Sequence, residues 1–374
     1  MASTDYSKLI EGIERTGFPL EYRTAQTLKT AGWTVISGKY YVDDTQQIPR
    51  EIDLIAYKVS KVDHLDICTT LIVSCKKSEN GAWALLARPL DGKDPNMDFW
   101  PLHLSTNDKA IQFEISDREQ KKRYHADALS KGVHEALRMP GADIFAFQDM
   151  NLTSGAAKND KPIFDAITSL VQAQAYELGA LPARKKNPFV YQFNLISVSQ
   201  ADLVRFDFNG DEISSTPLAS EHYIARYIIQ RQETFSRVHF VKAEAFAKIL
   251  PDYNRLHEVN CLLIKERDQE FYASVVTDRK RLVIYLADFR KALAHTLNWR
   301  VSLDLKLSKD FKGMDLEWDD KSQQIHIELE VGFNENIIAF LNADALAKNA
   351  AADVLKRLYR YSGSFSFVEY KFPF

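Results

Sequence analysis

The first third of the chain carries one helical pattern followed by three strand patterns. Residues 19–33 repeat apolar positions at a rough helical period, and Gly32 predicts the end of that helix. Residues 33–44 and 50–59 are rich in β-branched and aromatic side chains, which predicts two strands. Residues 69–77 are largely apolar, which is typical of a buried central strand. The predicted order is therefore helix, strand, strand, strand.

The pattern changes between about residues 88 and 160, where turn-forming residues and a polar loop surround one predicted helix at 116–139. We interpret this region as an insertion on the core. An amphipathic helix is predicted over 161–179, with Pro162 near its start, and a further strand over 189–199. The middle of the chain thus returns to alternating helix and strand after the insertion.

The last third combines short strand-like runs with one long helical pattern, which predicts an α+β domain. The helical pattern covers residues 335–361. The stretch 251–257 gives the best domain boundary, so the predicted domains are 1–255 and 256–374. The predicted strands lie at 259–266, 271–276, 281–289, 299–308 and 324–331.

Composition limits the kind of protein this can be. The 374 residues are 45% hydrophobic and 26% charged, which is ordinary globular composition with enough length for two domains. A net charge of −3 provides no overall attraction for nucleic acid, so any such attraction must come from local patches. No apolar run approaches the roughly 20 residues of a membrane span, and the N-terminus lacks an apolar signal core. We therefore expect a cytoplasmic protein without membrane contact.

Several common site chemistries are absent from the sequence. The three cysteines are too few and too scattered for a disulfide framework or a zinc site. The nine histidines show no HxxxH or His-x-His spacing. The sequence contains neither a GxxxxGK[ST] phosphate loop nor a GxSxG nucleophile elbow. Zinc hydrolysis, P-loop use of ATP and serine hydrolysis of the GxSxG type are therefore not expected.

An acid and a lysine on adjacent predicted strands suggest phosphodiester chemistry. Asp53 could supply carboxylate oxygen to a hard divalent cation, and Lys76 could position a water molecule. Neighbouring strands lie about 5 Å apart, which leaves room for a metal and a water between the two side chains. Glu21 on the preceding helix could complete the acidic cluster. Glu51 is a further candidate because it lies two residues before Asp53, on the same strand face.

The order of these elements and residues resembles the PD-(D/E)xK superfamily of nucleases, which have the restriction-endonuclease-like fold. The resemblance rests on Glu21 in "PLEYRTAQTLKTAGW", Asp53 in "REIDLIA" and Lys76 in "LIVSCKKS". Gln172 and Tyr176 in "SLVQAQAYELG" are similar to the Gln-x-x-x-Tyr element of RecB-like members. Residues spaced by four share a helix face, so both could point at one site.

The resemblance covers roughly residues 17–200 and implies both a fold and an activity. The implied fold is an α/β core of order αβββαβ, with a mixed central sheet flanked by helices. The implied activity is Mg²⁺- or Mn²⁺-dependent cleavage of DNA, in bacterial anti-phage defence, restriction or repair, by a homo-oligomer or a subunit of a larger complex. Asp53, Glu21 and the Cys75 carbonyl would bind the metal, Lys76 would position the water, and Gln172 and Tyr176 would support the site.

Ser74 departs from the family pattern, because it stands where these nucleases have their second acid. A serine hydroxyl is neutral at pH 7 and binds Mg²⁺ much less well than a carboxylate. Three alternatives stay open. Other groups, among them Glu51 or Glu79, carry the metal and activity survives. The site is inactivated, and the chain is a nucleic-acid-binding or scaffold subunit. Only the fold is retained, and the chain binds another protein.

Basic residues within the nuclease-like part provide candidate contacts to DNA phosphates. Such contacts are independent of base sequence and depend on lysine and arginine side chains. Clusters of surface charge are otherwise solvated faces of helices and loops. The candidates are Lys77, Lys121, Lys122, Arg123, Arg184, Lys185 and Lys186.

Overall fold

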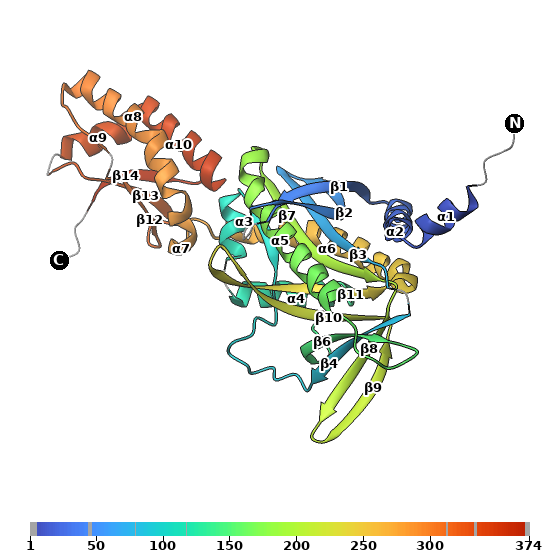
Figure 1. The fold of residues 1–374 in the computed structure, drawn as a ribbon. Helices are drawn as coiled ribbons and strands as arrows, with labels where there is room; N and C mark the ends of the chain where they lie inside the picture. Colours follow the sequence, from blue (N-terminus) through green and yellow to red (C-terminus); the bar gives the residue numbers. More distant parts are fainter. Residues whose placement is uncertain are drawn as a thin grey trace, which may run out of the picture. The chain divides into compact units, whose positions relative to one another are not determined.

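The structure is a computed structural model that describes residues 6–43, 47–78, 80–116, 118–311, 313–332 and 335–370. The chain forms two compact units (Figure 1). The first consists of Met1–Asp108 and Ile115–Leu263, and the second of Lys109–Glu114 and Ile264–Phe374. Both units combine helices with a sheet, so the protein is of mixed α/β class. The units divide within helix α6 (Phe246–Ala273), which also contains the boundary stretch predicted at 251–257.

A mixed sheet forms the centre of the first unit, and seven strands of it lie within the described residues. Its order is β1-β2-β3-β7-β11-β10, with β5 also paired to β7. The first three strands form an antiparallel meander, whereas β7 is parallel to both β3 and β11. The bounds are β1 (Thr34–Val42), β2 (Pro49–Val62), β3 (Leu65–Lys76), β5 (His103–Thr106), β7 (Phe189–Ser199), β10 (Ser220–Ile229) and β11 (Gln232–Lys242).

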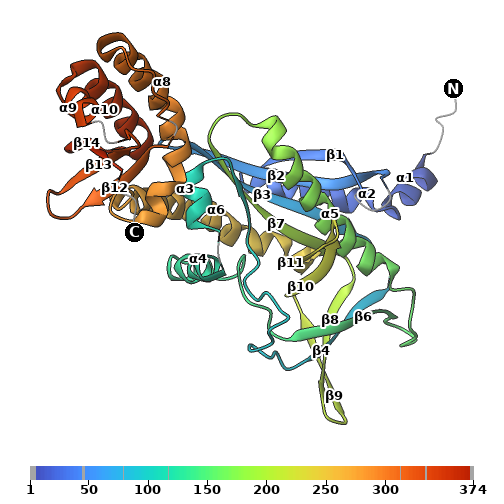
Figure 2. The ribbon, with the colours of Figure 1, turned by 90° about the vertical axis from the view of Figure 1, so that its left-hand side faces the viewer.

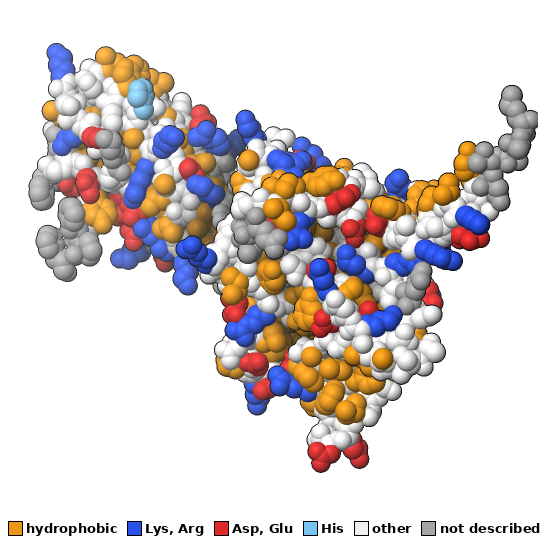
Figure 3. Space-filling model, viewed as in Figure 1, with side chains coloured by type: hydrophobic (Ala, Val, Ile, Leu, Met, Phe, Trp, Pro, Cys, Tyr) orange, Lys and Arg blue, Asp and Glu red, His pale blue; other side chains and the backbone are white. Residues whose placement is uncertain are grey.

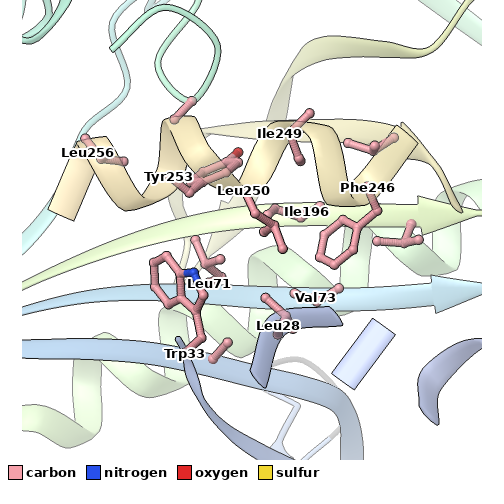
Figure 4. Close-up of a cluster of buried hydrophobic side chains, with 14 of the residues drawn as sticks. Leu28, Trp33, Leu71, Val73, Ile196, Phe246, Ile249, Leu250, Tyr253 and Leu256 are labelled. Carbon is pink, nitrogen blue, oxygen red and sulfur yellow. The ribbon is translucent and has the colours of Figure 1, made fainter. Parts of the chain in front are cut away.

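Different helices cover the two faces of this sheet. Alternation along β3 sends Leu71 and Val73 to one hydrophobic cluster and Ile72 to the other. The first cluster packs under α2 (Phe18–Thr30), α4 (Arg118–Ser130) and α6, and Figure 4 shows Phe246 and Leu250 directed at the sheet. The second cluster packs under α5 (Lys161–Arg184), which lies along the sheet in Figure 2. Each fully buried Leu, Ile or Phe contributes roughly 1.5–3 kcal/mol, so both faces are firmly held.

A second, smaller sheet of the first unit has the order β6-β4-β8-β9 among the described residues. The region 88–160, predicted as an insertion, contributes β6 to it, β5 to the central sheet and α4 to one face. The bounds are α1 (Ser7–Glu14), β4 (Gly81–Arg88), β6 (Asp143–Asn151), β8 (Asp202–Asn209) and β9 (Glu212–Leu218).

The second unit packs helices around a sheet of order β12-β13-β14. The core of this unit includes one face of α8, whose side chains are all 0% exposed and recur every four residues: Phe289, Leu293, Leu297 and Val301. The bounds are α3 (Lys109–Glu114), α7 (Arg279–Leu282), α8 (Leu286–Leu305), β12 (Asp315–Asp319), β13 (Gln324–Leu329), α9 (Glu335–Ala343), α10 (Ala345–Tyr359) and β14 (Phe365–Glu369).

Four of the five strands predicted in the last third are wrong. The structure has helix over 259–266, a helix end and turn over 271–276, and helical turns over 281–289 and most of 299–308. Short apolar runs fit a buried helix as well as a strand. Here the run 259–266 packs on the central sheet as part of α6, and the later runs pack in the cluster around α8. The prediction of a strand at 324–331 is confirmed by β13.

The long helix predicted over 335–361 is instead two helices, α9 and α10. The break falls at Asp344, whose backbone is extended and whose side chain accepts a hydrogen bond from the backbone N–H of Ala347. Aspartate at this position satisfies an unpaired N–H at the start of a new helix. The apolar period continues through Asp344, but this N-cap ends α9 and starts α10.

Candidate functional site

The ladder between β2 and β3 ends next to Asp53. Its last pair is Leu54 with Val73, and the same register would place Asp53 opposite Ser74. There, Asp53 Oδ2 accepts the backbone N–H of Cys75 at 2.6 Å and the Ser74 hydroxyl at 3.2 Å. A carboxylate oxygen thus takes over as acceptor where the strand ladder stops. This contact fixes the Asp53 side chain at the point where the two strands separate.

Strand β3 continues beyond this point beside β7 and carries Lys76 to the same region. Its parallel ladder with β7 extends to the pair Lys76 and Ser199. Lys76 and Ser74 lie on one face of β3 because they are two residues apart. That face is the one covered by α5, since Ile72 belongs to the cluster under that helix.

An open pocket of about 530 Å³ lies between this end of the sheet and α5. The sheet contributes Glu51, Asp53 and Lys76 to its lining, together with Tyr41 and Arg50. The helix contributes Asp165, Thr168, Ser169 and Gln172. The structure therefore brings together four predicted site residues: Glu51, Asp53, Lys76 and Gln172.

Glu21 belongs to the same electrostatic cluster, although it does not line the pocket. It lies in the first turn of α2. Burial raises the pKa of Glu21, the carboxylates of Asp53 and Glu51 raise it further, and the Lys76 ammonium partly opposes them. A carboxyl whose pKa is raised by burial and by neighbouring carboxylates is a common feature of sites that bind cations or protons. The predicted acidic cluster thus exists as a set of interacting charges.

The side chains of this cluster are of a type that can bind a divalent metal. Carboxylate oxygens are the ligands that Mg²⁺ prefers, and the mutual repulsion of these acids is what a divalent cation would relieve. Within the described residues, however, no group of three or more His, Cys, Asp or Glu side chains is arranged to hold a metal ion. Glu79, a further predicted candidate, lies outside the described residues.

Cys75 contributes to the site through its backbone N–H. Its N–H donates to Asp53, and its side chain belongs to the cluster under α2 and α6. Burial, and then the charge of Asp53, raise the pKa of the Cys75 thiol to about 12, so the thiol stays protonated. The role predicted for its carbonyl as a metal ligand stays a prediction.

The two predicted α5 residues have different positions. Gln172 is buried and lines the pocket, and its Oε1 has no hydrogen-bond partner among the described residues. Tyr176 is 37% exposed and lies outside the pocket lining. Its ring packs against Tyr41, with 6.4 Å between the ring centroids. Tyr176 therefore reaches the pocket only through Tyr41.

Sequence reasoning missed several pocket residues. Asp165, Thr168 and Ser169 precede Gln172 at helical spacing, so extending the helix face by two turns would have found them. No sequence signal pointed to Tyr41, whose hydroxyl is buried and has no hydrogen-bond partner among the described residues. Burial raises the pKa of Tyr41 to about 12, so this hydroxyl remains a hydrogen-bond donor at neutral pH.

The predicted phosphate-binding residues on α5 do not reach the pocket. Arg184 lies 12 residues beyond Gln172, about 18 Å along the helix. It pairs with Glu177 at 3.0 Å, and Lys185 lies over the ring of Tyr191. These side chains therefore have internal partners at the far end of the helix.

The other predicted basic residues are distributed around the first unit. Lys121, Lys122 and Arg123 lie on α4, which packs on the sheet face opposite α5. Lys77 directly follows β3, and its Nζ donates to the Glu14 carbonyl at 2.7 Å. On the face drawn in Figure 3, basic and acidic side chains of this unit are interspersed, without one broad basic surface.

The comparisons with known proteins give no family for the chain. No family model, curated protein or solved structure matches it. Among the helices within the described residues, none has the length and apolar character needed to cross a bilayer.

Proposed function

We propose that the chain is a metal-dependent nuclease that hydrolyses DNA phosphodiester bonds, built on a restriction-endonuclease-like core. The order α2, β1, β2, β3, α5, β7 supports this proposal, because it is the αβββαβ order implied by the resemblance. The antiparallel meander followed by a parallel fourth strand supports it too. A role in defence, restriction or repair, as an oligomer or a subunit of a larger complex, belongs to the same proposal.

The observation that carries the proposal is the position of Asp53. Its carboxylate is fixed at the end of the β2–β3 ladder, beside Lys76 and within a cluster that includes Glu21 and Glu51. Both contacts to Asp53 come from neutral donors, so its negative charge stays available to a ligand. An anionic cluster with one neighbouring cation is suited to metal-assisted attack of water on a phosphate.

Each residue has a distinct task in this mechanism. Asp53 and Glu51 in the pocket would hold Mg²⁺ or Mn²⁺, with the nearby Glu21 adding negative charge, and the metal would lower the pKa of a water molecule and stabilise charge on the phosphate. Lys76 would orient the attacking water. Ser74 and the Cys75 N–H keep the Asp53 side chain in place. The Tyr41 hydroxyl and Gln172 would hydrogen-bond substrate oxygens in the pocket.

The test is incubation of plasmid and linear DNA with the purified chain, with Mg²⁺, Mn²⁺ or EDTA. We expect cleavage with metal and none with EDTA, and loss of cleavage in Lys76→Ala. Asp66→Asn is a matched control, because Asp66 lies near the opposite end of β3. Cleavage that survives Lys76→Ala at the native rate would contradict the mechanism.

A specific observation favours a second candidate, a nuclease-fold subunit that binds nucleic acid without cutting it. Ser74 supplies a hydroxyl to Asp53 where the resemblance implies a metal-binding acid. In this case the native chain does not cleave, whereas Ser74→Glu does. Absence of cleavage and of metal binding in both chains would exclude the enzyme and leave a binding or scaffold role.

A further inference from the structure

Arg237 of β11 is a buried cation without a counterion in the described part of the chain. It is 8% exposed, and no described carboxylate lies within 4.0 Å of its guanidinium. Its Nη2 donates to His125 Nε2 at 3.2 Å, and its Nε has no hydrogen-bond partner among the described residues. A buried charge left unpaired costs several kcal/mol, so such groups are normally matched by an opposite charge.

The histidines around Arg237 are neutral. Burial lowers the pKa of His103 to about 4 and those of His125 and His239 to about 3, and the Arg237 charge adds to each effect. His125 Nδ1 donates to the Lys121 carbonyl at 2.8 Å, which leaves Nε2 as the acceptor for Arg237. Asp98 acts on Arg237 only electrostatically. No nearby group balances the positive charge directly.

A cavity of about 20 Å³ borders this cation. Its polar lining includes Arg237, His103, Asn194, His239 and Tyr253. The cavity therefore has room for at least one particle of the size of a water molecule. His239 adds a candidate donor: Nδ1 lies 3.0 Å from the Tyr253 hydroxyl, and Nε2 has no partner among the described residues.

We propose that this cavity binds one monatomic anion, chloride, held by the Arg237 guanidinium. If the Tyr253 hydroxyl donates to His239 Nδ1, His239 Nε2–H is a second donor for the ion. The small volume of the cavity favours a monatomic anion, and the unpaired positive charge favours an anion over water. This site is independent of the nuclease proposal.

The position of the cavity gives the ion a structural role. Its lining includes Leu102 and His103, at the start of β5, and Ala136 and Leu137. Residues of β7, β11 and α6 complete the lining. Residues 102–103 and 136–137 both belong to the region 88–160. The bound ion therefore fastens this region to β7 and β11 of the central sheet.

The first experiment locates the ion in the native chain. Crystals grown in bromide should show an anomalous scattering peak in the cavity, in contact with Arg237. An ordinary water in place of that peak would overturn the proposal. This measurement does not depend on any variant being able to fold.

The second experiment measures thermal unfolding in chloride and in gluconate at equal ionic strength. Gluconate is too large for the cavity, so the Tm of the native chain should rise further in chloride than in gluconate. In Arg237→Met the two salts should act equally. The control is Arg267→Met, because Arg267 is also buried but pairs with Glu270 at 3.1 Å, and this variant should keep the chloride effect. An equal response of the native chain to both salts would contradict the proposal.

Discussion

The two units each contain an open pocket of about 530 Å³ lined by acids and basic side chains, and they differ in whether a cation is left outside an ion pair. In the second unit, Arg279 forms two hydrogen bonds with Asp315, at 3.0 and 2.7 Å. In the first, Arg50 pairs with Asp43 at 2.7 Å, but Lys76 forms no ion pair among the described residues, and Asp53 is held by neutral donors. Similar composition therefore gives different chemistry, since a bidentate arginine–carboxylate pair neutralises its own charges.

The second pocket also contains an acid whose pKa is raised. Asp315 pairs across the β12–β13 ladder with Glu328, and Glu317 lies two residues along the same face. Burial, and then the Glu317 carboxylate, raise the pKa of Glu328 to about 7. A carboxyl that shares a proton with its neighbour lowers the charge of the pocket. The second pocket thus has its arginine paired and one acid with a raised pKa, whereas the first keeps Lys76 and Asp53 outside any ion pair among the described residues.

The largest expected effect comes from Asp53→Asn. This change keeps the shape of the side chain and removes the charge on which the proposed site depends. We expect DNA cleavage to fall by more than about 100-fold, because even residues that only orient metal ligands change activity 10–100-fold. Cleavage assays at a saturating metal concentration measure this fall in activity. Asp315→Asn in the second pocket should leave cleavage unchanged, and an equal loss in both variants would remove the distinction between the pockets.

Ser74→Glu should give the next largest effect, on metal affinity. Ser74 is 4% exposed and contacts Asp53, so a carboxylate there meets a like charge in a buried position. The variant should unfold at a lower temperature without metal and recover with Mn²⁺. Titration calorimetry should show metal binding at least about 10-fold tighter than in the native chain.

The control for Ser74→Glu is Ser74→Ala, which removes the hydroxyl without adding charge. Loss of one hydrogen bond to a charged group costs about 1.5–3 kcal/mol at most, and metal should not restore this loss. Recovery of Ser74→Ala with Mn²⁺, to the same extent as Ser74→Glu, would contradict a role of the new carboxylate in metal binding.

Glu328→Gln should change the pH dependence of stability in the second unit. The pKa of Glu328 is raised from 4.5 to about 7 on folding, so between these values the native state binds more protons than the unfolded state. The native unit should therefore lose stability as the pH rises through this window, and the variant should lose less. Hydrogen exchange of β12 and β13 at pH 5 and pH 8 measures this loss of stability in both chains. Identical profiles would show that Glu328 is not protonated there.

The smallest effect is expected from Arg279→Gln. Arg279 is 55% exposed and Asp315 is 19% exposed, so solvent screens much of their attraction. We expect a loss of about 1 kcal/mol in the unfolding free energy, and cleavage at the native rate. Urea denaturation with a parallel cleavage assay checks both. A loss of cleavage would mean that the second pocket takes part in the activity.

The predictable part of the fold is the part with clear local periodicity. The helix predicted over 19–33, the three strands after it and the helix beginning at 161 are confirmed by α2, β1, β2, β3 and α5. In the last third, apolar runs of similar length are helical, because one packs on the central sheet as part of α6 and the others pack in the cluster around α8. Those runs carried no local signal that separates a buried helix from a strand.

The candidate site was predictable only in outline. Residues two apart on a strand share a face, so Lys76 and Ser74, or Asp53 and Glu51, could be grouped from the sequence. The contact of Asp53 with the Cys75 N–H depends on where the β2–β3 ladder stops, and Tyr41 enters the pocket from a different strand. Neither feature follows from the local pattern.

The sequence by itself determined the type and order of α2, β1, β2, β3, α5 and β7 in the first unit, and the strand faces on which Asp53, Glu51 and Lys76 lie. Those properties depend on periods of 3.6 and 2.0 residues, which each segment carries on its own. Only the tertiary structure decided which charges remain unpaired. Asp53 has neutral donors, Asp315 has an arginine, and Arg237 has no carboxylate within ion-pair distance in the described part of the chain. Those outcomes depend on strand register and burial, which bring together residues far apart in the sequence.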